Sequence, residues 1–573
     1  MKVHDFIKIN LTFLISLLMG FCAFYTWRIG WYPDHVLWKT EPLLRESDVP
    51  WIMAISVVIF FIISFGFKRL SRFSAIRPVE ISVNRRLTLF ISLFLLLLWL
   101  PYFLVFYPGT GMNDTTDIMR SGVLAMIQHT LAYIIYIWGL TQLSDLLFHT
   151  KEFGLAAASL IQMVVMAWVI GFCLSRFYRW TGQRKLLIAL ILYYGFTPMI
   201  INMSFSNVKD VFFSISILLF VPVLFSFASS SDFSVWKNNR LLFIAAGLAM
   251  AFFRNNGLIP FAVLALIIVF FLNKKVHLNY LLIVLLMLVG GIGVEQMVRN
   301  HYAIPYLLQE RAGIQIQQFG RAVTLGRPLT AEEKAYSRRM ITPGSIEKLY
   351  DPFFVDTIKW TPEFNFVYFN GNPSEFYKNW KSTWERNKRV YIDAWLLSTY
   401  GFWAFPAPDG MVQSRFGHAF TEQDITYKWG MKPKYNNEFR IATIRNFFPP
   451  WLQEFLGSWL WKHSRYAGAG TCFWITMMIG LLLVYRKQYR RLLVLLPSSL
   501  IWGTLILATP AAFVYRYVYF FPLCMPFFIL LPFLPNGRYG ETKWAETMLP
   551  QKKEEEKSGN ISRVGDGYTH WKD

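Results

Sequence analysis

Two carboxylates stand three residues apart in the stretch YPGTGMNDTTDIMR, residues 107–120. The stretch follows an apolar run and opens with a Pro-Gly turn. If it is helical, Asp114 and Asp117 share one face, because residues three apart are neighbours on a helix surface. A carboxylate held in this way can take a proton from an acceptor hydroxyl, which is general base catalysis.

Cations with polar neighbours stand at the ends of other apolar runs: Lys209 and Asp210 in SNVKDVFF, Arg254 and Asn255 in FFRNNG, and Arg516 in PAAFVYRYVYF. Ionisable residues at membrane depth are costly and usually mark function. Cations can neutralise a phosphate that gains charge as it leaves. The break at RNNG is expected to point backbone N–H groups at an anion. The pattern predicts group transfer from a lipid phosphate, with Asp210 and Asn255 as further substrate contacts.

Each of these residues also has a simpler interpretation. Asp114 could cap the helix that follows, which does not exclude catalysis, and Asp117 could be an exposed acid in its first turn. Lys209 and Arg254 could be anchors whose charged ends reach toward water. Arg516 could be an anchor among the tyrosines of an aromatic belt.

Composition places the chain among membrane proteins. Of its 573 residues 54% are hydrophobic, and the mean hydropathy is positive, which excludes a soluble enzyme. Its formal charge of +22 is expected to come from Lys and Arg in cytoplasmic loops, so we do not expect nucleic-acid binding. The four cysteines lie in apolar runs, which argues against a disulfide framework or a cysteine zinc site.

The distribution of charge predicts the topology. A basic loop at residues 68–86 indicates that this loop and the N-terminus are cytoplasmic, so residues 87–106 run outward and Asp114 becomes external. Residues 121–150 are apolar enough to cross the membrane. A crossing, however, would put the basic cluster at residues 176–185 outside. We therefore expect helices that lie along the outer membrane surface.

The sequence thus predicts an all-α polytopic protein of the cell membrane with about twelve transmembrane helices, juxtamembrane helices and cytoplasmic termini. Its expected parts are a two-span extension (1–86), a transmembrane core with the first external loop (87–298), a large external loop domain (299–468), C-terminal transmembrane helices (469–534) and a disordered cytoplasmic tail (535–573). No internal repeat is visible, which argues against an inverted-repeat transporter.

The large external loop has features of its own. Gln318 and Arg321 are polar residues of an expected helix in IQIQQFGRAV, and aromatic residues gather in LYDPFFVDTIKW and YGFWAFPAPDG. Aromatic surfaces with scattered amides suit sugar rings, and they equally suit a plain folded domain resting on a membrane. We take Gln318 and Arg321 as candidate substrate contacts.

Over residues 87–534 the chain resembles an uncharacterised GT-C-like family of polytopic bacterial membrane proteins. The resemblance lies in the order of six stretches: PGTGMND, SNVKDVFFS, FRNNG, IQIQQFGRAV, YDPFFVDTIKW and YGFWAFPAPDG. The resemblance implies the GT-C glycosyltransferase fold and inverting transfer of a sugar from a polyprenyl-phosphate donor on the external face. The acceptor would be a cell-surface glycan or a lipid. By position, Asp114 becomes the general base, and Lys209 and Arg254 become ligands of the donor phosphate, with Arg516 as a further candidate.

The chain departs from the expected pattern in one place. We would look for a glutamine or second acid shortly after Asp114 and find Asp117 in TTDIM, so the role of Asp117 is open. If these two carboxylates bind a divalent metal, oxygen ligands of this kind suit Mg²⁺ or Mn²⁺. Two other functions fit less well: a transporter or flippase for a lipid-linked saccharide, and a non-catalytic scaffold, which leaves the expected clustering of charges unexplained.

Overall fold

The computed structural model describes residues 3–31, 43, 45–73, 76, 85–110, 113–230, 233–270, 277–406, 447–464, 468–512 and 514–535. Throughout these ranges the regular structure is helical, and the only pairings of strand type are three isolated bridges. The all-α prediction is therefore confirmed for the described residues. The predicted disordered tail, apart from its first residue, and the end of YGFWAFPAPDG lie outside them.

In the described part of the chain, nine helical segments are long and apolar enough to cross a membrane. Their helices are α1 (Val3–Trp31), α3 (Val49–Leu70), α4 (Arg85–Val105), α6 (Leu131–Phe148), α7 (Glu152–Thr181), α10 (Lys209–Ser229), α13 (His277–His301), α28 (Leu492–Ala508) and α29 (Phe520–Leu530). The pair α8 (Arg184–Phe196) and α9 (Pro198–Ser204), bent by 61°, makes ten if it counts as one span.

Three expected spans are shorter or less apolar than a full crossing requires. The apolar segments Asn255–Val269, which contains α12 (Leu258–Val269), and α27 (Ala469–Tyr485) have fewer than 18 residues. Helix α11 (Phe233–Phe253), which also contains an apolar run, is not among the nine. The count of about twelve spans therefore stays a prediction, and nine or ten is what length and composition support.

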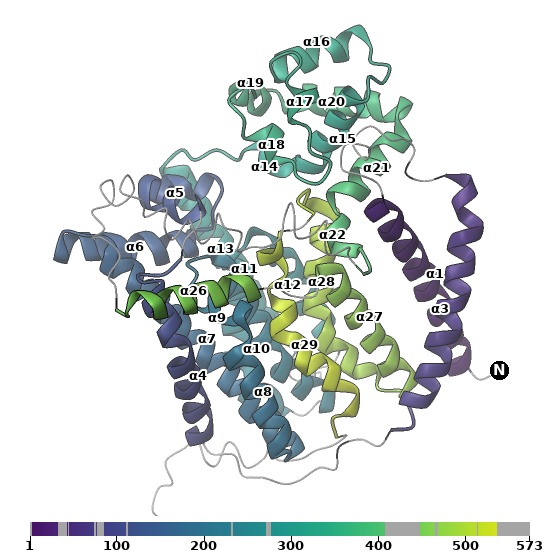
Figure 1. Cartoon of the computed structure of the whole chain (residues 1–573). Coiled ribbons are helices and arrows are strands. Elements are labelled where there is room, and N and C mark those ends of the chain that lie inside the picture. Colours follow the sequence, from purple (N-terminus) through teal and green to yellow (C-terminus); the bar gives the residue numbers. More distant parts are fainter. Residues whose placement is uncertain are drawn as a thin grey trace, which may run out of the picture.

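Helices α4 and α7 run antiparallel, which decides how residues 121–150 lie. At one end the Thr88 hydroxyl donates to Ser175 at 3.0 Å, and at the other the Ser159 hydroxyl donates to the carbonyl of Pro108 at 2.9 Å. The chain between these helices therefore leaves and re-enters the bundle at the same end. Helix α6 lies crosswise to α4 and α8 (Figure 1), which supports the expected surface helix, although its length and composition would allow a crossing.

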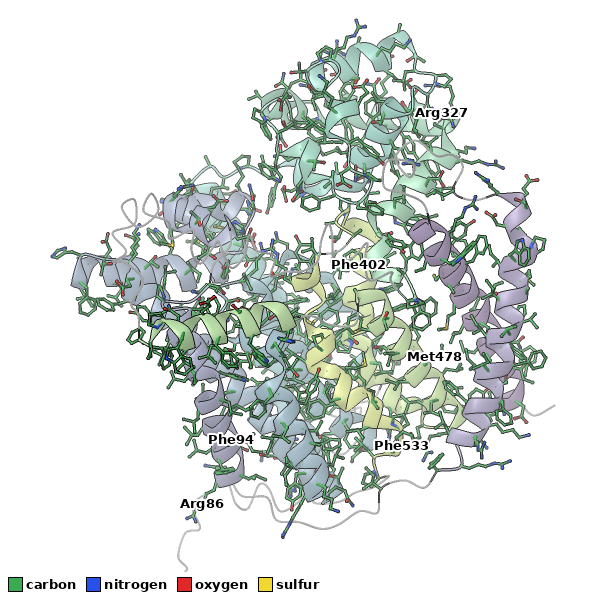
Figure 2. All side chains as sticks on the ribbon, in the orientation of Figure 1. Arg86, Phe94, Arg327, Phe402, Met478 and Phe533 are labelled. Carbon is green, nitrogen blue, oxygen red and sulfur yellow. The ribbon has the colours of Figure 1, made fainter. Side chains whose placement is uncertain are left out.

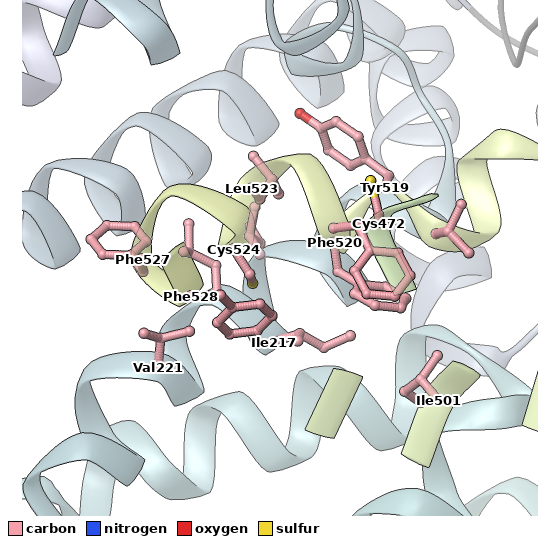
Figure 3. Packing of buried hydrophobic residues seen from close by; sticks show 14 of the residues in the cluster. Ile217, Val221, Cys472, Ile501, Tyr519, Phe520, Leu523, Cys524, Phe527 and Phe528 are labelled. Atoms are coloured by element: carbon pink, nitrogen blue, oxygen red, sulfur yellow. The ribbon is translucent and has the colours of Figure 1, made fainter. Parts of the chain in front are cut away.

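Helix α10 is the centre of the bundle. Nearly all of its side chains are buried, and it packs against α7, α11, α28 and α29. Figure 3 shows Ile217 and Val221 of α10 facing the aromatic residues of α29, such as Phe528. Because α10 is apolar on every side and the most deeply buried of the nine candidate spans, its first residues, Lys209 and Asp210, are held by the interior of the bundle.

The loop that was expected to be external forms a domain, here named the external domain, with its own core at one end of the bundle (Figure 1). Its helices are α14 (Leu308–Arg311), α15 (Gly313–Thr324), α16 (Ala331–Met340), α17 (Ile346–Leu349), α18 (Asp356–Lys359), α19 (Phe366–Gly371), α20 (Pro373–Arg386), α21 (Lys388–Ser398) and α22 (Tyr400–Trp403). The core includes Phe319, Tyr336 and Phe376. Helix α1 reaches the end of this region, since the amide of Phe405 donates to the Thr26 hydroxyl at 2.9 Å.

Cations gather at the opposite end of the bundle. Figure 2 shows Arg86 and Phe533 at the end away from Arg327 of the external domain. Arg490 donates to the carbonyl of Phe227 at 3.2 Å, and Arg491 donates to that of Leu531 at 2.7 Å. Loops that are far apart in the sequence therefore meet at one basic end. A further helix, α26 (Pro450–His463), lies crosswise beside α4 and α9 (Figure 1).

Candidate functional site

Five ionisable side chains from separate parts of the sequence meet at the start of α10 and are here named the charged cluster: Asp114, Lys209, Asp210, Arg254 and Arg516. Asp114 comes from α5 (Asn113–Ser121), and Arg516 comes from the short turn η6 (Tyr515–Val518). One Asp114 oxygen, Oδ2, accepts from Nη1 of Arg516 at 3.1 Å and lies 3.6 Å from Nζ of Lys209. The structure therefore brings together the base and two of the cations that the sequence predicts.

Asp210 forms the inner half of this charged cluster. Its Oδ1 lies 3.1 Å from Nη1 of Arg254, and its Oδ2 lies 3.8 Å from Nε of Arg516. Arg516 therefore bridges both carboxylates. The guanidinium of Arg254 also lies 4.1 Å from the ring centre of Tyr517, which is a favourable cation–π position.

The cluster is layered. The side chain of Asp210 is fully buried and that of Arg254 is 8% exposed, whereas those of Asp114, Lys209 and Arg516 are 14–20% exposed. Three cations stand against two carboxylates, so the cluster carries one excess positive charge. An anion approaching from outside meets Lys209 and Arg516 first, with Asp114 beside them.

Side chains of α7 fix the distance between Asp114 and Lys209. The loop after α4 pairs with the loop before α10, where the amide of Asn207 donates to the carbonyl of Thr110 at 2.7 Å. The Gln162 amide donates to the carbonyl of Ser206 at 2.8 Å, and the Thr115 hydroxyl donates to that of Asn207 at 2.6 Å. These buried hydrogen bonds join α5 to α10.

Gly109 is a requirement of this loop. Its φ of +122° is one that only glycine adopts readily, and an added Cβ would lie 1.9 Å from the Ser159 hydroxyl and 3.0 Å from the carbonyl of Phe205. We therefore expect Gly109→Ala to destabilise the protein by about 2 kcal/mol or more, a usual magnitude for backbone strain. Thermal unfolding in detergent measures this, with Gly139→Ala as the control because its Cβ meets nothing within 4 Å. Equal melting temperatures for the two variants would contradict the account.

The external domain positions Arg516. The amide of Val355 donates to the carbonyl of Pro510 at 3.1 Å, and the amide of Ala512 donates to that of Phe353 at 2.9 Å. The stretch YDPFFVDTIKW thus holds the segment that leads into η6. The position of one cation of the charged cluster, Arg516, therefore depends on contacts with this domain.

The two predicted carboxylates differ in environment. Burial raises the pKa of Asp114, but the charges of Arg516 and Lys209 outweigh this and hold that pKa well below its usual range. The side chain of Asp117 is exposed, although neighbouring atoms remove some of the water around its carboxyl, and this desolvation and the charge of Asp114 raise its pKa. Asp114 is therefore an ionised, cation-bound carboxylate, whereas Asp117 lies outside the charged cluster.

The predicted metal site does not fit this geometry. Oδ2 of Asp114 already contacts two cations, and Asp117 is exposed. Among the described residues no group of three or more His, Cys, Asp or Glu side chains could hold a metal ion.

The remaining predicted residues lie elsewhere. Asn255 is exposed in η3 (Asn255–Gly257), next to Arg254. Gln318 accepts a hydrogen bond from the Trp380 indole at 2.9 Å and donates to the carbonyl of Tyr391 at 3.3 Å. Arg321 is fully buried in the same domain. The structure thus gives Gln318 and Arg321 places inside the external domain and does not bring them to the charged cluster.

One residue beside the charged cluster, His129, was not among the predicted site residues. Nδ1 of His129 lies 3.0 Å from Nζ of Lys209. A single histidine in an apolar segment gives no sequence signal for such a contact. Only the antiparallel arrangement of α4 and α7, which returns this segment to the start of α10, explains why the two residues meet.

Comparison with known proteins gives one match. A model described as a family of unknown function (DUF6020) matches residues 120–557. Neither the curated proteins nor the solved structures contain a match. The matched range includes Lys209, Asp210, Arg254 and Arg516 and begins six residues after Asp114.

Proposed function

Because the chain belongs to a family of unknown function, DUF6020, its activity must be inferred from the site, and we propose that it is an integral membrane glycosyltransferase. It moves a sugar from a polyprenyl-phosphate donor to a glycan or lipid acceptor. The observation that carries the proposal is the charged cluster, in which a partly exposed carboxylate lies within 3.6 Å of one cation and 3.1 Å of another. Such a cluster supplies both a base and an anion site.

The proposed reaction is an inverting displacement. Lys209 and Arg516 bind the donor phosphate, and Arg254 adds positive charge from the buried side of the charged cluster. Asp114 takes the proton of the acceptor hydroxyl, whose oxygen attacks the anomeric carbon. The bond from this carbon to the phosphate oxygen breaks, and its electron pair leaves with the polyprenyl phosphate. The three cations stabilise the charge that the leaving group gains.

The donor is expected to release the base as it binds. Lys209 and Arg516 contact Asp114, and a donor phosphate competes for the same two cations. Once they turn to the phosphate, the carboxylate loses its partners and becomes a better proton acceptor. The base is thus weak before the donor binds and stronger afterwards, which limits wasteful hydrolysis.

This exchange predicts two different pH profiles. Transfer needs an ionised Asp114, so the rate falls as the pH falls through its pKa. The profile of kcat/KM reports the free protein, where the cations hold this pKa low, so it should stay level down to about pH 4. The profile of kcat reports the complex and should fall at a higher pH. Initial rates between pH 4 and 8 test this, and coincident profiles would contradict the exchange.

The distribution of charge supports an external site. The charged cluster and the external domain lie at the end of the bundle opposite the basic loops, and Lys and Arg collect on the cytoplasmic side of membrane proteins. We propose cytoplasmic termini, a GT-C-like arrangement of about twelve spans and an acceptor bound by residues 299–468. The donor enters sideways from the outer leaflet.

A donor screen tests the proposal. Purified full-length protein is incubated with a panel of polyprenyl-phosphate sugars, and the release of free polyprenyl phosphate is followed. Release from one donor supports a glycosyltransferase and identifies the sugar. Binding without release from any donor would instead favour the flippase, which uses the same anion site without breaking a bond.

A further inference from the structure

His129 is the closest polar partner of Lys209 in the described part of the chain. The distance from Nζ to the His129 Nδ1 is 3.0 Å, shorter than the 3.6 Å to Asp114. His129 lies between η2 (Gly122–Ile127) and α6, and its side chain is buried. The contact therefore joins the segment that lies across the bundle to the first turn of the central helix.

The surroundings of this contact determine the protonation state and the tautomer of the imidazole. Burial, together with the charge of Lys209, lowers the pKa of His129 to about 3, although Asp114 acts in the opposite direction. The ring is therefore neutral at pH 7. The other groups facing it are Arg516 and the edge-on ring of Tyr133. Because an ammonium can only donate, Nδ1 accepts and Nε2 carries the proton.

A packing role alone does not explain a histidine here. Nε2 is buried and has no hydrogen-bond partner among the described residues, which costs free energy that an apolar side chain would avoid. The contact between Nδ1 and Lys209 is the interaction that an imidazole makes here and an apolar side chain does not. A neutral acceptor holds the ammonium without cancelling its charge, whereas a carboxylate at the same place would neutralise it.

We propose that His129 is a positioning residue that holds the Lys209 ammonium ready for the donor phosphate and leaves its charge available. The inference rests on the proposed function, because that function assigns Lys209 to the phosphate. It adds a neutral side chain, outside the five charged residues, on which donor affinity depends.

Binding of polyprenyl phosphate to the purified full-length protein in detergent tests the proposal. In His129→Asn the amide oxygen can take the place of Nδ1, whereas His129→Leu has no acceptor and His129→Gln places its acceptor farther along the side chain. We expect the Kd to rise about tenfold in the Leu and Gln variants and to stay within about threefold in the Asn variant. With an active donor, KM should rise while kcat stays nearly unchanged.

The outcomes separate the two proposals. Wild-type affinity in all three variants overturns the role of His129 and leaves the proposed function standing. Equal losses in all three also overturn it, because the position of the acceptor would then not matter. If the wild type does not bind polyprenyl phosphate, the proposed function and this inference fall together. If the Leu variant does not fold, the comparison of Gln with Asn carries the test.

Discussion

Replacing Asp114 with Asn is expected to lower kcat for sugar transfer by about 10³-fold, within the usual contribution of a general base. The amide keeps the shape of the side chain but cannot accept the proton of the acceptor hydroxyl. Folding should survive, because Arg516 keeps its contact with Asp210 and Lys209 keeps its contact with His129. Initial rates with saturating donor measure the effect.

Asp117→Asn is the matched control. It removes the same charge at a position three residues away, where the side chain is exposed and lies outside the charged cluster. We expect its rate to stay within about threefold of the wild type, because exposed charges contribute little. If the two variants lost equal activity, the assignment of the base to Asp114 alone would be wrong, and the two carboxylates would have to act together.

Replacing Asp210 with Asn should have the largest effect on stability. This carboxylate is fully buried between Arg254 and Arg516. Its loss removes the ion-pair partner of Arg254 in the interior and leaves Arg516 with Asp114 as its carboxylate partner. Breaking a buried ion pair on one side costs about 3–5 kcal/mol. Thermal or denaturant unfolding in detergent should show this loss, whereas Asp117→Asn should unfold like the wild type.

A double variant separates loss of charge balance from loss of packing. In Asp210→Asn combined with Arg254→Met, one unpaired cation is gone, and part of the lost stability should return. If the double variant were less stable than Asp210→Asn by the full effect of Arg254→Met alone, the two residues would not be coupled. The pair would then not be the inner support of the charged cluster.

The sequence predicted the five members of the charged cluster because its signals are local. A charge at the end of an apolar run is costly wherever it stands, so Lys209, Arg254 and Arg516 could be selected without knowing the fold. The charge rule also placed residues 121–150 along the surface, and the antiparallel packing of α4 and α7 agrees with this. Asp114 could be chosen because a Pro-Gly turn and an apolar run precede it.

The sequence could not supply what depends on contacts between distant segments. Gln318 and Arg321 are of residue types that often bind sugars, but in the structure Gln318 bonds to Trp380 and Arg321 is buried, both inside the external domain. His129 has no distinctive neighbours in the sequence. The number of spans also depends on where helices end, because a short apolar run such as α27 looks like a full span in the sequence, whereas its helix has only 17 residues.

The most direct test of the account uses sealed proteoliposomes with a polyprenyl-phosphate sugar that carries a radiolabel in the sugar. The fate of the label is compared between wild type and Asp114→Asn. The account predicts that wild type moves the label off the lipid, with an equal amount of free polyprenyl phosphate formed, and that the variant does not. Label that stays on the lipid and moves between leaflets at the same rate in both proteins would contradict it.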